Sequence, residues 1–167
     1  MRNRRFLIVS LLLLAIGFSS VTTVLYLTNS LVIQTNKEDF QVIFTSAVLD
    51  GVDVTSEPGV ISIDKKGIDY TTKDLAIKGV DSSLLQYTIA NNSSQYDANV
   101  SVVCGEGLEN DPYVVITSSL SNEVIKAGES LAGTVRVDLK KSALEEVEDK
   151  LLHCDIEAVA VEKGINE

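Results

Sequence analysis

Apolar and polar residues alternate along most of the chain beyond residue 36. The alternation covers residues 40–44, 85–89, 98–102, 131–139 and 156–160, with shorter candidates at 60–63, 75–77 and 113–117. Successive side chains of a strand point to opposite faces, so a period of two predicts strands with one buried and one solvated face. Such strands must bury their apolar faces against one another.

Turn-forming dipeptides separate these stretches. Asp50-Gly51, Asp111-Pro112 and Ala127-Gly128 are examples, and an asparagine and serine turn spans residues 91–94. Many short strands at this spacing predict an all-β fold, an immunoglobulin-like or jelly-roll β-sandwich. We expect it to occupy residues 37–167 as one domain.

One segment near the C-terminus has helical spacing instead. Ser142 and Glu145 form a capping-box pattern, and Leu144, Val147 and Leu151 follow on one helical face. We therefore expect one short helix over residues 142–152, crossing between the last two strands.

The first 36 residues predict export. Arg2, Arg4 and Arg5 precede an uncharged stretch over residues 6–36, a pattern that directs a chain to the membrane and leaves the arginines in the cytoplasm. Residues 1–20 are a signal peptide or the start of a helical signal anchor. Residues 21–36, rich in β-branched residues, are a strand-like segment or the outer part of that anchor. The rest of the chain is then extracytoplasmic, either secreted or membrane-anchored.

The exported part is strongly acidic. Setting aside the three N-terminal arginines leaves 11 basic residues against 24 acidic ones, a net charge of −13. Such a domain is repelled by nucleic acid and by anionic lipid, which excludes both as partners of the domain. Membrane contact is expected through the N-terminal segment alone.

The two cysteines, Cys104 and Cys154, fall on the inward phase of their predicted strands. Two inward thiols could meet in the core, and an extracytoplasmic compartment permits a disulfide. The alternative is two buried free thiols that pack as small hydrophobic residues. We favour the disulfide.

The chain shows no pattern typical of an enzyme. It has no phosphate-binding glycine loop and no nucleophile elbow, and His153 is its single histidine. His153 and Cys154 are adjacent in a predicted strand, so their side chains point to opposite faces. Acidic residues gather in two loops, at 50–57 and 109–111, without a recognised calcium spacing. We predict no catalytic residue, cofactor, metal site or small-molecule substrate.

Several segments together resemble the exported β-sandwich proteins of Firmicutes grouped with TasA and camelysin. They are a hydrophobic leader ending in small residues, VTTVLYL after it, and then DFQVIF. LQYTIANNSSQYDANVSVVC and IKAGESLAGTVRVDL follow later in the chain. The match is one of architecture and extends over nearly the whole chain.

The resemblance implies a secreted sandwich with a role in extracellular matrix or fibres. In fibre-forming members the segment after the leader is a donor strand that completes the sheet of the next subunit. Here the donor side chains would be Val24, Leu25, Leu27, Leu31, Val32 and Ile33. Camelysin-like members have been described as metalloproteases, but this chain has no His-Glu-x-x-His motif. The expected helix at 142–152 departs from the fibre-forming pattern.

Two functions follow from the sequence. The first is a non-enzymatic surface or matrix protein that self-associates by donor-strand or edge-strand addition. The alternative is a membrane-anchored binding module that presents loops, such as residues 91–97 and 105–111, to a protein or glycan partner.

Overall fold

The computed structural model describes residues 25–36, 40–75, 82–105, 111–140 and 150–162, and these residues form ten strands in two sheets. Sheet A contains β1 (Leu25–Thr35), β4 (Gly67–Leu75), β6 (Tyr96–Cys104), β8 (Val124–Ile125) and β10 (Lys150–Glu162). Sheet B contains β2 (Val42–Leu49), β3 (Val52–Asp53), β5 (Ser82–Asn91), β7 (Val114–Leu120) and β9 (Ser130–Leu139). The strand orders are β4-β1-β10-β6-β8 and β3-β2-β5-β9-β7.

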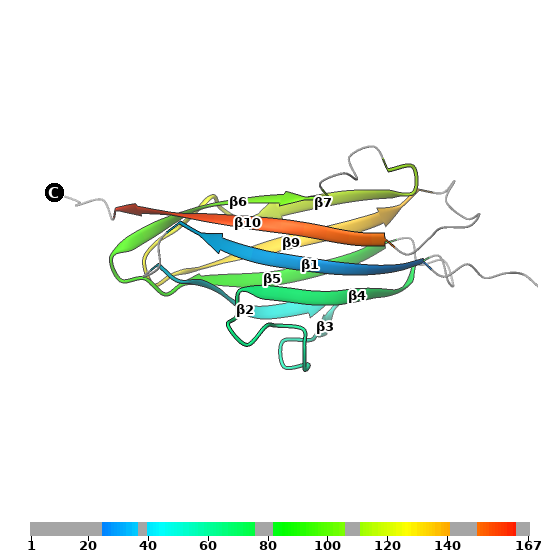
Figure 1. Ribbon diagram of the computed structural model, residues 1–167, viewed down its shortest axis with the longest axis horizontal. Coiled ribbons are helices and arrows are strands. Elements are labelled where there is room, and N and C mark those ends of the chain that lie inside the picture. Colours follow the sequence, from blue (N-terminus) through cyan, green and yellow to red (C-terminus); the bar gives the residue numbers. More distant parts are fainter. Residues whose placement is uncertain (1–24, 37–39, 76–81, 106–110, 141–149, 163–167) are drawn as a thin grey trace, which may run out of the picture.

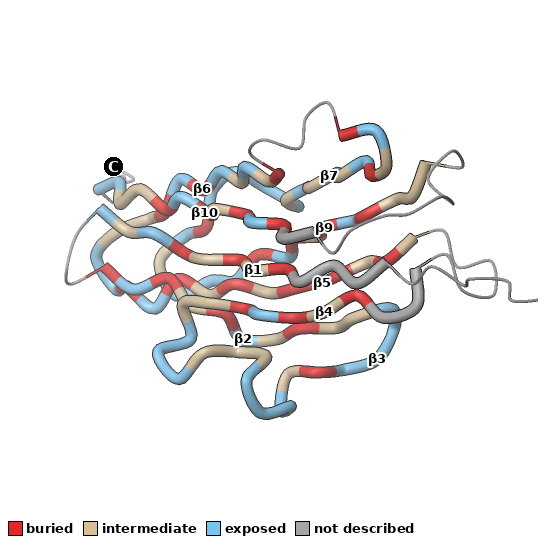
Figure 2. The backbone as a smooth tube through the Cα atoms, turned by 45° about the vertical axis from the view of Figure 1, so that its right-hand side comes forward, coloured by how far each residue is buried: buried red, intermediate tan, exposed pale blue. Residues whose placement is uncertain are grey.

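The two sheets bury one hydrophobic core between them. In Figure 1, β1 and β10 of sheet A lie in front of β5 and β9 of sheet B. Buried and exposed residues alternate along the strands, visible in Figure 2 as changes of colour along each tube. The core takes Leu31 and Ile156 from sheet A, and Phe44, Leu85 and Val135 from sheet B. The predicted all-β fold is confirmed at this level, as the two-layer arrangement of a β-sandwich.

The predicted turn at Asp50-Gly51 forms the tight hairpin between β2 and β3. Both residues have positive φ, 51° at Asp50 and 82° at Gly51. A two-residue loop with two positive φ values matches the right-handed twist of the strands it joins, and Asp-Gly is a favoured pair there.

Three strand predictions differ from the structure. Residues 60–63 contain an isolated bridge from Ile61 to Ile68 in place of a strand. β4 begins well before the predicted 75–77, because Ile68, Tyr70 and Thr72 point inward and form the alternation. Residues 76 and 77 lie outside the described residues. The first and last strands, β1 and β10, pair in parallel, whereas the alternation favoured antiparallel neighbours.

The helix expected over residues 142–152 is wrong for its last three residues. Lys150–Leu152 are the start of β10, and they pair in register with Leu27, Thr28 and Asn29 of β1. Pairing with a neighbouring strand overrides local helical spacing here, and Leu152 is buried on the same phase as Cys154. Residues 141–149, with the capping box, lie outside the described residues, and so do residues 1–24 with the expected N-terminal helix. Within the described part of the chain, no helix is long and apolar enough to cross a membrane.

Tyr87 fills the middle of the inner face of sheet B. Its ring meets that of Phe44 edge to face, with centroids 5.7 Å apart and planes at 81°. The same ring covers Gly133, its partner on β9. A Cβ at Gly133 would stand 2.3 Å from Cζ of Tyr87, so close approach requires glycine there.

We expect Gly133→Ala to lower the free energy of unfolding by about 1–3 kcal/mol, because the added methyl group must displace the Tyr87 ring. Urea unfolding measures the change. Ala132→Ser, one residue away on the exposed side of β9, serves as the control and should change stability by less than about 0.5 kcal/mol. Equal stabilities for the two variants would contradict the close approach.

Two tyrosine hydroxyl groups are buried in this core. Neither Oη of Tyr70 nor Oη of Tyr87 has a hydrogen-bond partner among the described residues. Burial raises the pKa of both phenols, and at Tyr70 the nearby charge of Asp50 raises the pKa further. Both side chains therefore remain neutral in the folded protein at a pH where the unfolded chain ionises.

We expect the free energy of unfolding to fall as the pH rises above about 10, the pKa of a tyrosine in the unfolded chain. The folded pKa is the higher one, so the contribution is fully present below pH 10 and is lost as pH rises toward the folded pKa. Tyr87→Phe should weaken this alkaline loss and leave stability near pH 7 unchanged or higher, since the Tyr87 hydroxyl has no hydrogen-bond partner in the described part of the chain. Urea unfolding of both proteins at neutral and alkaline pH tests this, and equal pH dependence would contradict it.

Candidate functional site

The candidate site is the place in sheet A that β1 occupies. One edge of β1 pairs antiparallel with β4, from Leu25 opposite Leu75 to Val32 opposite Gly67. The other edge pairs parallel with β10 over nine residues, ending at Thr35 opposite Ala158. β4 and β10 are not neighbours in the sheet, so β1 is the strand that joins them (Figure 1).

Apolar and polar contacts together hold β1 in this place. Leu31 and Ile33 point into the core and are 0% and 3% exposed. On the outer face, Gln34 Nε2 donates to Asp155 Oδ1 at 2.9 Å. Asn36, just beyond the strand, accepts a hydrogen bond at its Oδ1 from the Ala160 amide at 3.0 Å. The hydrogen bonds of Gln34 and Asn36 fix the register of β1, and the burial of Leu31 and Ile33 determines which of its faces points into the core.

The six predicted donor residues do not have one role in this strand. Leu31 and Ile33 are core residues, while Val32 between them faces the outside of sheet A and is partly exposed. For Leu25 and Leu27 the structure describes the backbone of β1, and Val24 lies outside the described residues. The apolar anchors that the structure shows are therefore Leu31 and Ile33.

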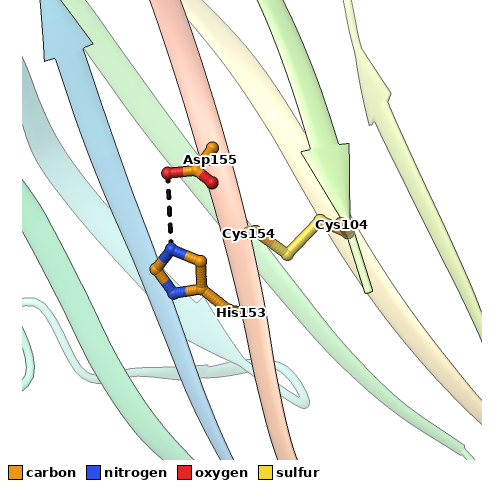
Figure 3. Close-up of a disulfide and its surroundings, with 4 residues drawn as sticks. All are labelled: Cys104, His153, Cys154 and Asp155. Atoms are coloured by element: carbon orange, nitrogen blue, oxygen red, sulfur yellow. Dashed lines mark ion pairs between the residues drawn. A yellow bond between two sulfur atoms is a disulfide. The ribbon is translucent and has the colours of Figure 1, made fainter. Parts of the chain in front are cut away.

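The structure contains the predicted disulfide. Cys104 on β6 and Cys154 on β10 stand directly opposite each other, with Cα atoms 4.1 Å apart (Figure 3). The next pair along these strands, Gly105 and His153, is joined by a hydrogen bond from the Gly105 amide to the His153 carbonyl. Cys104 and Cys154 are therefore a non-hydrogen-bonded pair, the kind in which opposed Cα atoms lie closer together. Cys154 is fully buried. It is also the register partner of Leu31, so the disulfide lies level with the centre of β1.

His153 and Cys154 point to opposite faces, as the sequence predicts for adjacent strand residues. Figure 3 shows His153 directed toward Asp155, with 3.3 Å between Nε2 and Oδ1, and Cys154 directed toward Cys104. The imidazole is about half exposed on the outer face, and the sulfur is bonded in the core. This arrangement supplies no base for a cysteine nucleophile.

Asp50, Asp53 and Asp111 accept hydrogen bonds from neighbouring parts of the chain. The Asp50 carboxylate accepts hydrogen bonds from the Ser83 hydroxyl and the Leu84 amide. Hydrogen bonds from the Thr55 hydroxyl and amide lower the pKa of Asp53. Asp111 accepts hydrogen bonds from two amides of the following turn, at 2.8 and 3.0 Å. Within the described ranges, no three His, Cys, Asp or Glu side chains gather closely enough to hold a metal ion.

The turn over residues 91–97, one of the two loops considered for partner binding, is tied to the body of the protein. Asn91 is 1% exposed, and its amide donates to the carbonyl oxygens of Tyr96 and Ile125. Ser93 accepts two amide hydrogen bonds within the turn. The Asn91 and Ser93 side chains thus hydrogen-bond to the protein's own backbone. Residues 106–110 of the second loop lie outside the described residues.

Comparison with known proteins gives no relative of this chain. No protein-family model, no curated protein and no solved structure matches it.

We expect Cys104→Ala/Cys154→Ala to lose about 4 kcal/mol of stability, because the disulfide closes a long loop in the unfolded chain. The sequence separation of the cysteines is 50 residues. Urea unfolding of the variant and of the oxidised protein measures the difference. The reduced wild-type protein is the control and should unfold with the variant; a variant as stable as the oxidised protein would contradict the prediction.

Proposed function

We propose that this chain is a non-enzymatic exported protein of the cell surface or extracellular matrix that self-associates by exchanging β1 between copies. In the exchanged form, β1 of one copy lies between β4 and β10 of the next. The proposal includes the finer fold type, an immunoglobulin-like or jelly-roll sandwich, and an extracytoplasmic location. The arginine-led N-terminus supports that location, and a disulfide is compatible with it.

The observation that carries the proposal is the position of an N-terminal strand in the interior of a sheet. β1 is the first described strand of the chain, yet it is paired on both edges. A second copy offers the same strand with the same side chains, so exchange preserves every main-chain hydrogen bond and the burial of Leu31 and Ile33. Exchange of an identical element between copies is a route to assembly that needs no new interface.

Each wall of the site also has contacts that do not involve β1. The disulfide and nine register pairs hold β10 to β6. β4 is held through the segment before it, where the Asp69 amide donates to the Val60 carbonyl and the Phe44 amide of sheet B to the Lys65 carbonyl. A groove that keeps its walls when its strand leaves can accept the strand of a neighbour.

A cysteine pair across β1 and β4 tests the exchange. The hydrogen bond from the Ile33 amide to the Lys66 carbonyl makes Ser30 and Asp69 a non-hydrogen-bonded pair. Ser30 is partly exposed and Asp69 exposed, so Ser30→Cys/Asp69→Cys places two thiols within disulfide distance on the outer face. Ala90→Cys/Ser130→Cys, on β5 and β9, is the matched control because neither strand takes part in exchange.

The variants are purified from the cell surface or medium. We expect the order of oxidation and assembly to decide whether the disulfide forms within one copy or between copies. Oxidation before concentration should lock β1 in its own sheet and give single-copy bands on a denaturing, non-reducing gel. Oxidation after assembly should link copies into a covalent ladder on a denaturing, non-reducing gel. The control pair should give monomer bands in both orders. Assembly of the locked variant beyond a dimer, absence of a ladder, or a wild-type protein that never assembles would overturn the proposal.

A further inference from the structure

The outer face of the four longer strands of sheet B has no net charge in a strongly acidic protein. Its outward positions on β2, β5, β7 and β9 hold serine, threonine, glutamine, alanine and aliphatic residues, with Gln86 near the centre. Among these described positions, Arg136 and Asp138 on β9 are the charged ones, and they pair with each other. On the short edge strand β3, Asp53 lies opposite Val48 and adds one carboxylate at the margin of this face. The chain as a whole has a net charge of −10.

Several polar side chains of this face already hydrogen-bond one another. Arg136 Nε donates to both Asp138 carboxylate oxygens at 2.9 Å. The Ser46 and Thr88 hydroxyls are 2.8 Å apart, and the Ser119 and Thr134 hydroxyls 2.7 Å. A polar group that keeps its partner can be covered at much lower cost than one that loses water without replacement. The face can therefore be removed from solvent.

The outer face of sheet A lacks this property. It carries Asp69 on β4 and Asp155 and Glu157 on β10 at exposed or partly exposed positions. Two copies that met through these carboxylates would repel each other. Sheet B is the face on which a second acidic copy can approach.

We infer that two copies of this chain stack the outer faces of sheet B against each other about a twofold axis. A twofold interface brings a patch against itself, so Arg136 of one copy can face Asp138 of the second. The two residues lie two positions apart on one strand, and this ion pair makes the patch self-complementary in charge. β1 belongs to sheet A, so the stacking does not depend on strand exchange.

The size of the face sets the strength of the pairing. Four strands about 4.8 Å apart, with about seven residues each at about 3.3 Å, give roughly 450 Å² per copy. That area is at the low end for specific interfaces, where association is weak and reversible. The dimer should therefore appear at high micromolar concentration.

Sedimentation velocity over a concentration series tests the stacking. The oxidised Ser30→Cys/Asp69→Cys protein is used as background, because it cannot exchange β1. Gln86→Glu should weaken the dimer at least about tenfold by placing like charges across the twofold axis. Gln95→Glu, an exposed glutamine in the turn before β6, adds the same charge away from the face and should leave the dimer unchanged.

A charge-swap pair gives the decisive result. Arg136→Asp and Asp138→Arg should each remain monomeric alone, and their equimolar mixture should dimerise as well as the parent. A mixture no better than its components overturns the inference. A parent protein that stays monomeric at millimolar concentration also overturns the inference. The same holds if the monomeric parent binds an insoluble neutral glycan through this face. If the locked protein dimerises and strand exchange fails its own test, the stacking still stands.

Discussion

Sheet A depends on the main-chain hydrogen bonds that β1 makes along both of its edges. Without them β4, the edge strand, would have no strand neighbour in the sheet, and β10 would lose the parallel partner of its first nine residues. Main-chain pairing is indifferent to sequence, so specificity must come from the side chains that accompany it. Here Leu31 and Ile33 supply the inward anchors, and Gln34 and Asn36 fix the register.

The disulfide belongs to the same construction. Ile68, Leu31, Cys154 and Cys104 form one row across four strands, with Ile68 and Leu31 fully buried. The covalent bond fastens β10 to β6 on the far side of β10 from β1. It therefore acts on one wall of the β1 site and leaves β1 itself attached by non-covalent contacts alone. If β1 is released, β10, β6 and β8 remain paired, while β4 loses its strand neighbour and keeps the contacts of the segment before it.

Residue alternation in the sequence predicts much of this fold, because one-sided burial dictates it. β5, β6 and β9 and the inward cysteines all follow from a period of two. β4 is harder to recognise in the sequence because Thr72, a polar residue, occupies one of its inward positions. The parallel pairing of β1 with β10 joins residues more than 100 positions apart, and no local pattern encodes such a partner. The sequence predicts helix at the start of β10 because Leu151 lies at helical spacing from Leu144 and Val147, whereas pairing with β1 makes this segment a strand with Leu152 on its inward phase.

The two faces of the sandwich have different consequences for assembly. The proposed exchange of β1 is heterologous, since a strand of one copy would enter the groove of another, and its repetition would generate an open chain where the rotation between copies does not close a ring. Stacking through sheet B is isologous and closes after two copies. Because β1 lies in sheet A and Arg136 in sheet B, the two contacts use opposite layers and do not compete. Each weak stacking contact would then be repeated along two parallel chains, and effective concentration would make the pairing of chains far tighter than that of two monomers. The acidic outer face of sheet A would remain exposed on both sides of such a pair and limit further lateral growth by repulsion.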